Sequence, residues 1–460
     1  MQPHKLLFLI TATALSACSS IPTETEVKDA TQAQGPTAPK DWATAVNAEN
    51  VQIDWLASFD DPTLRKLIQE AQANNRDLQA AAASVERARA LAVQAGAALT
   101  PAVNLTAGTA QSGSADSSRP TTSSQSLGLQ VNWELDIWGR IRAGSQAAVS
   151  SAQAAEADYR YAKHSLAAAT VKSWLTVIEA NLQADIGQET LSVLKETLRI
   201  VNVQYKNGLA SAQDVALTRS DLASARERLT TIEGSKRDAI RALEILLGRY
   251  PSAELEVRHS LPKTPPLPPV GIPAELLERR PDMVAAERRV AAAFNSVAQA
   301  KAAKLPSLSL TSTIGGASSS LSSLLDPANI AWQAGTNLLA PIFDGGARQA
   351  QVDAATAEQK QALAAYGQAA FTAFAEVESQ LDQGVVLSQR EADLQEATAA
   401  ANEAYRIVRL RHKEGETALL DVLTIQQRVI SAKSNLASVQ RLLLEQRVNL
   451  HLALGGDWKI

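Results

Sequence analysis

The sequence predicts a mainly α-helical protein that also contains four β-strands, arranged as two copies of one strand-and-helix unit. Over 126–135, apolar and polar residues alternate with the period of two that a strand requires. A long Ala-rich helical pattern without proline follows, from about 141 to 205. The same order recurs in the second half, where a strand over 332–343 leads into a helix from about 347 to 412. An internal duplication is therefore predicted.

The composition fits long helices better than bulky globular domains. Hydrophobic residues make up 45% of the chain but aromatic residues only 4%, which suits helices packed closely through small side chains. The net charge of -4 gives no basic field for nucleic acid. The five histidines lack metal-ligand spacing, and no nucleophile–base or paired-carboxylate constellation stands out. We expect no enzyme, no metal and no nucleic-acid partner.

The N-terminal segment contains the only cysteine of the chain, Cys18. Lys5, a short apolar run and small residues before Cys18 are typical of a signal peptide over 1–17. Leu15-Ser16-Ala17-Cys18 resembles the lipobox of bacterial lipoproteins, which implies a covalent lipid on Cys18 as the only attached group. The alternative is an ordinary signal peptide with an incidental cysteine. Residues 18–54 are then interpreted as the lipid anchor and an extended N-terminal tether.

The rest of the chain divides into two structural repeats and a stiff linker. Each repeat has a helix that ends before a proline, a strand pair, and a helical hairpin with a glycine at its tip. The predicted ranges are 55–260 for the first repeat, with strands at about 102–110 and 125–135 and a tip at about 205–215; 261–270 for the Pro-rich linker; and 271–460 for the second repeat, with strands at about 307–314 and 332–343, a Gly/Ser loop at 315–323, and a tip at about 411–422.

The strands have the length and the alternation of membrane β-strands. Four strands cannot close a barrel, and an open edge in lipid leaves backbone groups unsatisfied. A trimer that pools four strands from each copy into a twelve-stranded barrel would solve this; a soluble α+β domain with half-buried hairpins is the alternative. Trp133, Trp138 and Trp332 fit an interfacial aromatic belt but could equally be core residues. The helices carry charges every turn or two, so we expect them to stand in water.

Four motifs carry a resemblance to a known family. They are 133–140 (WELDIWGR), 278–287 (ERRPDMVAAE), 341–346 (PIFDGG) and 454–458 (LGGDW). Together they resemble the signatures of TolC-like outer membrane factors, the lipoprotein branch of OprM and NodT. The resemblance implies a TolC-like fold: a homotrimer with a twelve-stranded outer membrane barrel, a periplasmic α-helical barrel of long coiled coils, and coupling to a periplasmic adaptor and an inner membrane pump of the RND type.

The resemblance also assigns roles to three groups of residues. The adaptor-facing tips would contain Tyr205, Gly208, Ser211, Asp214, Arg411, Gly415 and Asp421. The junction at the membrane interface would contain Trp133, Asp136, Trp138, Gly139, Arg140 and Gly345. Relatives commonly hold the closed aperture with an Asp–Arg pair past the second tip, but Thr424 and Gln427 stand at those positions here. Leu420, Asp421 and Arg428 are the other aperture candidates. Either Asp421 and Arg428 replace the charged pair from neighbouring positions, or hydrogen bonds and packing of Leu420 hold the aperture closed. The second is favoured, because a one-residue shift turns a helical side chain by about 100°.

The sequence therefore predicts an outer membrane exit duct of a tripartite efflux system, lipid-anchored in a Gram-negative outer membrane with a large periplasmic portion. It would export small molecules passively. A periplasmic coiled-coil scaffolding lipoprotein is the alternative, and the alternating strands disfavour it.

Overall fold

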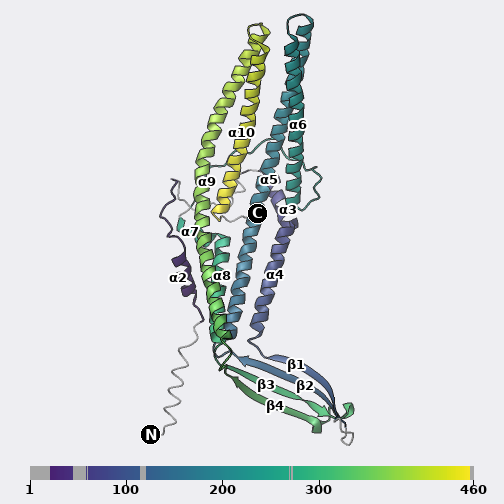
Figure 1. Ribbon diagram of the computed structural model, residues 1–460, viewed down its shortest axis with the longest axis vertical. Coiled ribbons are helices and arrows are strands. Elements are labelled where there is room, and N and C mark those ends of the chain that lie inside the picture. The colour runs from purple at the N-terminus through teal and green to yellow at the C-terminus, as the bar shows by residue number, and fades with distance from the viewer. Residues whose placement is uncertain are drawn as a thin grey trace. The chain divides into compact units, whose positions relative to one another are not determined.

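The computed structural model describes residues 21–44, 59, 61–113, 121–268, 270 and 273–455. Long helices and one four-stranded sheet dominate this part of the chain, as the sequence predicted (Figure 1). The chain divides into two compact units. Unit 1 contains the described residues of 1–36, 83–157 and 282–370, and unit 2 contains those of 37–82, 158–281 and 371–460.

The elements follow the duplicated order. In the first half they are α2 (Glu24–Gln34), α3 (Pro62–Asn74), α4 (Arg76–Ala97), β1 (Ala102–Ser112), β2 (Thr122–Leu135), α5 (Arg140–Lys206) and α6 (Ala212–Leu246). In the second half they are α7 (Pro273–Arg279), α8 (Pro281–Ala302), β3 (Ser307–Ser318), the short 3-10 turns η3 (Leu321–Ser323) and η4 (Pro327–Asn329), β4 (Ile330–Leu339), α9 (Ala347–Lys413) and α10 (Leu419–Ala453).

Among the helices in the described ranges, none has the length and hydropathy that a bilayer span requires.

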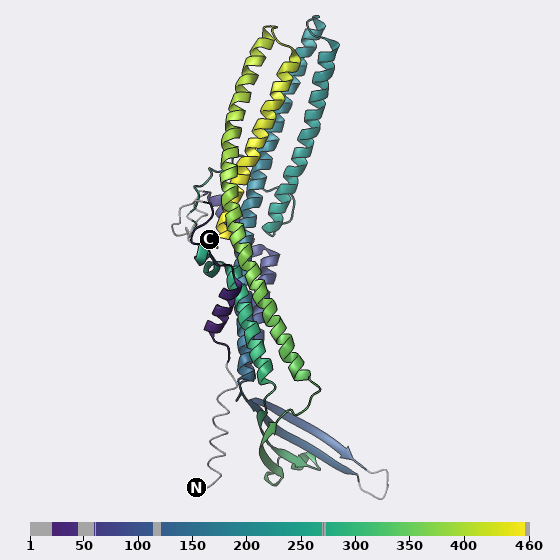
Figure 2. The same cartoon turned by 60° about the vertical axis from the view of Figure 1, so that its left-hand side comes forward.

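The sheet of unit 1 has the strand order β1-β2-β3-β4, with every neighbouring pair antiparallel (Figures 1 and 2). Residues directly opposite each other in such a ladder point to the same face. One row joins Leu105, Leu129, Ile314 and Trp332 across all four strands, and all four side chains are exposed. The row that joins Asn104, Gln130, Thr313 and Gln333 lies on the other face. The sheet is thus apolar on one face and polar on the other.

Several strand boundaries differ from the prediction. β1 extends to Ser112 and β2 begins at Thr122, so the connection between them is shorter than predicted. The strand predicted over 332–343 is β4, which ends at Leu339, because Pro341 has no N–H to donate to a ladder. The predicted Gly/Ser loop over 315–323 begins too early, since β3 continues to Ser318. A Cβ at Gly315 would lie 2.4 Å from the Leu127 carbonyl oxygen. The glycines therefore belong to the strand and permit a close approach of the neighbouring backbone.

Part of the segment predicted as an extended tether is helical in the described residues 21–44. Thr23 and Glu26 form a capping box, in which each side chain accepts a hydrogen bond from the other residue's backbone N–H, and α2 follows. Within unit 1 the end of this helix lies against α9, where a Cβ at Gly367 would sit 2.7 Å from the Gln34 carbonyl oxygen. The Thr-x-x-Glu pattern of this capping box is visible in the sequence.

Unit 2 is held together by apolar seams between its helices. The main core surrounds Trp174 and Ile178 of α5 and contains Leu64 and Ile68 of α3 and Leu243 of α6. Asp61 caps α3 by accepting from the N–H groups of residues 63 and 64, with Pro62 at the first helical position. A smaller cluster towards the tips joins leucines of α5, α6 and α10. Apolar burial of this kind is the main stabilising term for amphipathic helices.

Candidate functional site

The tip between α5 and α6 is a tight glycine turn followed by a capped helix. Gly208 has a φ of +72°, and the Leu209 N–H donates to the Gln204 carbonyl at 2.8 Å, which is the Schellman arrangement that satisfies the last carbonyls of a helix. The Ser211 hydroxyl accepts from the Asp214 N–H, and the Asp214 carboxylate accepts from the Ser211 backbone N–H. The Ser211 hydroxyl also donates to the Asp214 carboxylate at 2.7 Å, and this hydrogen bond, together with the one from the Ser211 N–H, lowers the pKa of Asp214. Tyr205 is exposed beside this turn.

The tip between α9 and α10 repeats the turn but not the cap. Gly415 has a φ of +78°, and the Glu416 N–H donates to the Arg411 carbonyl at 3.0 Å. Here α10 begins after Ala418, which has no side chain that can cap it. The His412 ring contacts the Thr417 carbonyl oxygen at 2.9 Å instead. Asp421 is exposed in the first turn, so the two tips share a backbone path and differ at the start of the returning helix.

Leu420, Thr424 and Gln427 lie on one stripe of α10, since their spacings are four and three residues. The Thr424 hydroxyl donates to the Leu420 carbonyl at 2.8 Å, so its proton is used within the helix. All three residues and Arg428 line a groove of about 1110 Å³ between α5, α6 and α10 of unit 2. Asp421 is not among its lining residues. The structure thus brings four of the five aperture candidates to one surface.

The predicted junction is the corner where β2 passes into α5. Asp136 caps α5 by accepting from the N–H groups of Ile141 and Arg142 at 2.8 and 2.9 Å. Burial alone would raise the pKa of Asp136, but these hydrogen bonds and the Arg142 guanidinium outweigh it and lower the pKa. Glu134 forms a bidentate ion pair with Arg140, with two contacts of 2.8 Å. The corner is thus fixed by carboxylates that bind the first turn of the helix.

Glycine and tryptophan complete this junction. Gly139 has a φ of +73°, and Ile21 lies 3.5 Å from the place where a Cβ would be. The indole N–H groups of Trp133 and Trp138 donate to the carbonyl oxygens of Leu99 and Pro306 at 3.0 and 2.6 Å. Both tryptophans therefore fasten helix–strand connections of unit 1, whereas Trp332 is exposed.

The second repeat builds the same corner with different residues. Asp344 accepts from the N–H groups of Gly346 and Arg348 at 3.0 and 3.2 Å, as Asp136 does for α5. Gly345 has a φ of +65°, and no atom of the described residues lies within 4 Å of the place where a Cβ would be. The glycine is required here by its backbone conformation rather than by lack of space.

One contact that the sequence did not predict joins two of the quoted motifs. Arg280, from the segment 278–287, is buried and donates to the Glu376 carboxylate at 2.7 Å and to the Ala453 carbonyl at 3.0 Å. It lies directly against Gly455, where a Cβ would be 2.9 Å from the Arg280 Cγ. The two motifs thus form one packing site in unit 2, and only their joint presence in the sequence could have suggested it.

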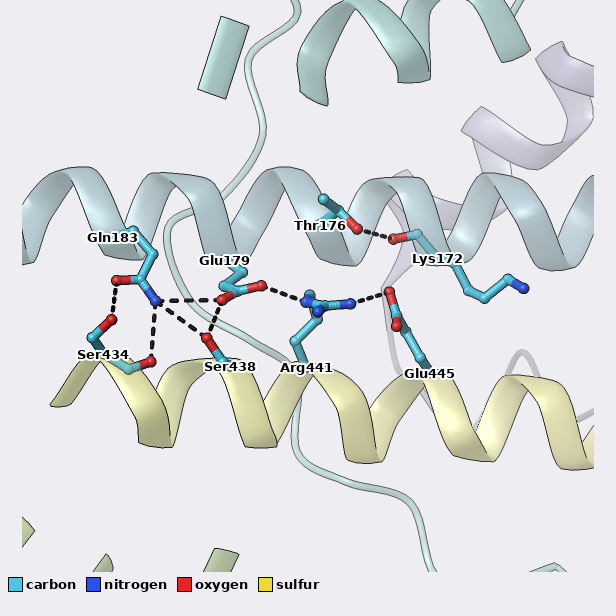
Figure 3. Close-up of polar contacts among 8 residues, drawn as sticks. All are labelled: Lys172, Thr176, Glu179, Gln183, Ser434, Ser438, Arg441 and Glu445. Atoms are coloured by element: carbon cyan, nitrogen blue, oxygen red, sulfur yellow. Dashed lines mark hydrogen bonds and ion pairs between the residues drawn. The ribbon is translucent and has the colours of Figure 1, made fainter. Parts of the chain in front are cut away.

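The sequence also did not predict a polar network between α5 and α10 (Figure 3). Arg441 lies between two carboxylates, Glu179 of α5 and Glu445 of its own helix, and forms an ion pair with each. Ser438 donates to Glu179, and Gln183 exchanges hydrogen bonds with Ser434. Burial alone would lower the pKa of Arg441, but the two carboxylates outweigh it and raise the pKa. The three charged side chains are only 15–19% exposed.

Within the described residues, no group of three or more His, Cys, Asp or Glu side chains could hold a metal ion. Cys18 and the end of the fourth motif, 456–458, lie outside the described residues.

Comparisons with known proteins agree with this arrangement. The family model described as outer membrane efflux protein matches residues 67–249 and 272–456, one segment in each predicted repeat. The pyoverdine export outer membrane protein OpmQ of Pseudomonas aeruginosa is 33% identical over 476 residues, which cover 99% of this chain and 97% of that protein. The cation efflux system protein CusC of Escherichia coli is 30% identical over 465 residues, which cover 99% and 100% of the two chains.

The fold is also similar to that of a solved outer-membrane channel. The solved structure of the outer-membrane channel OprN matches with a TM-score of 0.84 and 30% identity, covering 92% of this chain and 99% of that one. The predicted TolC-like fold and its internal duplication are confirmed. The chain belongs to the outer membrane efflux protein family.

Proposed function

We propose that this chain is a subunit of an outer membrane exit channel, through which small molecules leave the cell passively as the last step of tripartite efflux. The observation that carries the proposal is the sheet of unit 1. Its apolar rows lie on one face, its polar rows lie on the other, and within the described part of the chain its outer strands β1 and β4 each have one partner only. Such a sheet suits a wall between lipid and water.

The unpaired edges support a homotrimer. In lipid, each backbone group without a partner costs several kcal/mol, so an open sheet must find more strands. Pairing β4 of one copy with β1 of the next satisfies both edges, and three copies give a closed barrel of twelve strands. Barrels of this size are wider than the eight-stranded ones that side chains fill, which leaves room for an aqueous path.

A lipid on Cys18 would place an anchor close to this wall. Ile21 lies beside Gly139 at the junction between β2 and α5, 3.5 Å from the place where a Cβ would be. Cys18 precedes Ile21 by three residues, and three residues span at most about 10 Å. The acyl chains would then enter the membrane at the level where the strands begin, which is the placement that an outer membrane lipoprotein requires. A non-enzymatic role with no cofactor other than this lipid follows from the proposal.

The two helical hairpins would stand in the periplasm and present their tips to an adaptor, which would connect the channel to an inner membrane pump of the RND type. In this proposal Tyr205, Gly208, Ser211 and Asp214 form one docking tip, and Arg411, Gly415 and Asp421 form the other. The resting aperture would be closed by Leu420 packing and by neutral contacts of Thr424 and Gln427, with Asp421 and Arg428 beside them. OpmQ and CusC are named for different cargo, pyoverdine and cations, so we propose no single cargo.

The direct test is conductance. Full-length protein purified in detergent and added to a planar lipid bilayer should produce small and brief current increments, because the neutral contacts that close the aperture break and reform. A bilayer that stays sealed at the same protein load would contradict the channel function. Thr424→Ala should raise the current per channel if Thr424 helps to close the aperture. Thr230→Ala is the matched control, because Thr230 makes the same hydroxyl bond to a carbonyl four residues earlier on α6. Equal currents in the two variants would remove Thr424 from the aperture.

The anchor has its own test. Cells that express the wild-type chain should incorporate labelled palmitate into it, and Cys18→Ser should abolish the label. Label that persists in the variant would refute the lipobox interpretation.

A further inference from the structure

The polar face of the sheet carries a continuous row of neutral hydrogen-bonding side chains. Asn104 lies opposite Gln130, Gln130 opposite Thr313, and Thr313 opposite Gln333. We call these four residues the amide row. On the same face, the next row towards the junction contains Asn132 and Thr311, and the row beyond it contains Ser309, Asn337 and Glu134. Amides and hydroxyls both donate and accept hydrogen bonds, so this face offers the same contacts to solutes of either charge.

Formal charge is almost absent from the strands. Glu134 is the only charged residue in the four strand segments. It stands at the junction end of β2, and its carboxylate is neutralised by the bidentate ion pair with Arg140. It follows Gln130 by four residues, which is about 13 Å along a strand. The amide row therefore lies beyond about one Debye length of the nearest strand charge at 0.1 M salt.

We propose that the amide row lines the solute path and makes the strand section a charge-neutral, hydrogen-bonding wall, so that this section passes polar organic solutes without selecting cations over anions. The inference rests on the proposed channel function and adds the residues that set the charge preference of its membrane section. In a trimer, the amide row contributes twelve neutral side chains to the wall of the path. A single charge in the row would appear three times around the path, so the absence of charged residues from this row strongly affects which ions the section favours.

Two adjacent residues give a matched test. Thr313 belongs to the amide row, whereas Ser312 belongs to the row of Val103, Val131 and Ala334 on the apolar face. Thr313→Cys and Ser312→Cys are small changes at neighbouring positions on β3, and neither puts a charge into the chain before it folds. Full-length variants are reconstituted into planar bilayers and treated from the aqueous phase with a cationic or an anionic alkyl methanethiosulfonate. The cysteine thiolate attacks the reagent sulfur, a sulfinate leaves, and a mixed disulfide with the charged group remains.

The readout is the potassium-to-chloride permeability ratio, measured under a salt gradient. The cationic reagent on Thr313→Cys should shift the ratio towards chloride and the anionic reagent should shift it towards potassium, with larger shifts at 0.1 M than at 1 M salt because screening is weaker. Ser312→Cys and the treated wild type, whose only cysteine is Cys18, should keep the untreated ratio.

The remaining outcomes separate an error in the amide row from an error in the channel function. Channels that conduct but do not respond at Thr313→Cys, or that respond at Ser312→Cys instead, would overturn the assignment of the amide row while leaving the channel function intact. Failure of the wild type to conduct at all would reject the channel function itself, and the inference with it.

Discussion

Removing Arg441 should destabilise unit 2 strongly, because it leaves two carboxylates facing each other in a largely buried seam. Glu179 and Glu445 are 15% and 16% exposed, and Arg441 is the cation between them. Taking one partner out of a buried ion pair costs about 3–5 kcal/mol. Because these side chains retain some contact with solvent, we expect about 3 kcal/mol for Arg441→Met. Glu179→Gln should cost only about 1 kcal/mol, since Arg441 keeps Glu445 and the amide can still accept from Ser438.

The measurement is urea unfolding of the detergent-solubilised full-length protein, followed by far-UV circular dichroism, as a double-mutant cycle. Glu179→Gln should become neutral or stabilising in the Arg441→Met background, because it then removes an uncompensated charge. The exposed pair Glu403–Arg406 on α9 is the control, and Arg406→Met should leave the unfolding midpoint unchanged within error. Additive losses for Glu179→Gln and Arg441→Met would refute the idea that the network is an electrostatic unit.

Three further predictions concern other parts of the chain. Burial and the nearby Arg447 lower the pKa of His451 to about 3, so below about pH 6.5 the unfolded chain binds a proton that the folded chain does not. The free energy of unfolding should therefore fall as the pH drops from about 6.5 towards 3. His451→Gln should flatten that part of a stability–pH curve. Ala418→Ser should create with Asp421 the capping box that Ser211 and Asp214 form in the other tip. This cap should stabilise the first turn of α10 by about 1 kcal/mol and slow its amide hydrogen exchange. Unchanged exchange in α10, together with faster exchange in α6 for Ser211→Ala, would contradict the comparison of the tips. Gly455→Ala should lower the thermal midpoint more than Gly345→Ala. Both glycines have a φ of +65°, but of the two only Gly455 has described atoms, those of Arg280, within about 3 Å of the new methyl group. Equal losses would show that the backbone conformation alone matters.

Local patterns in the sequence predicted most of the helical framework. The helix expected over about 141–205 is α5, Arg140–Lys206, because an unbroken apolar periodicity without proline leaves few alternatives. Both tips were found from Gly208 and Gly415, whose positive φ angles the Schellman turns require. The alternation in 126–135 likewise predicted the two faces of the sheet.

Contacts between residues far apart in the chain could not be predicted from the sequence. Glu179 and Arg441 are 262 positions apart, and each resembles any other exposed charge on a long helix until the packing of α5 against α10 is known. Among the predicted site residues, Asp136 and Arg140 proved to hold the corner between β2 and α5 through caps and ion pairs. Helix α2 was missed because a short capped helix has too few residues to show a period.

The mass of the particle that full-length protein forms in detergent tests the central claim most directly. Native mass spectrometry should give three chains per particle, because the open edges of β1 and β4 need partners and the sheet closes with twelve strands. Three chains should persist at low protein concentration, since the strands would share one hydrogen-bonded wall. A stable particle of one chain would contradict the exit-channel account.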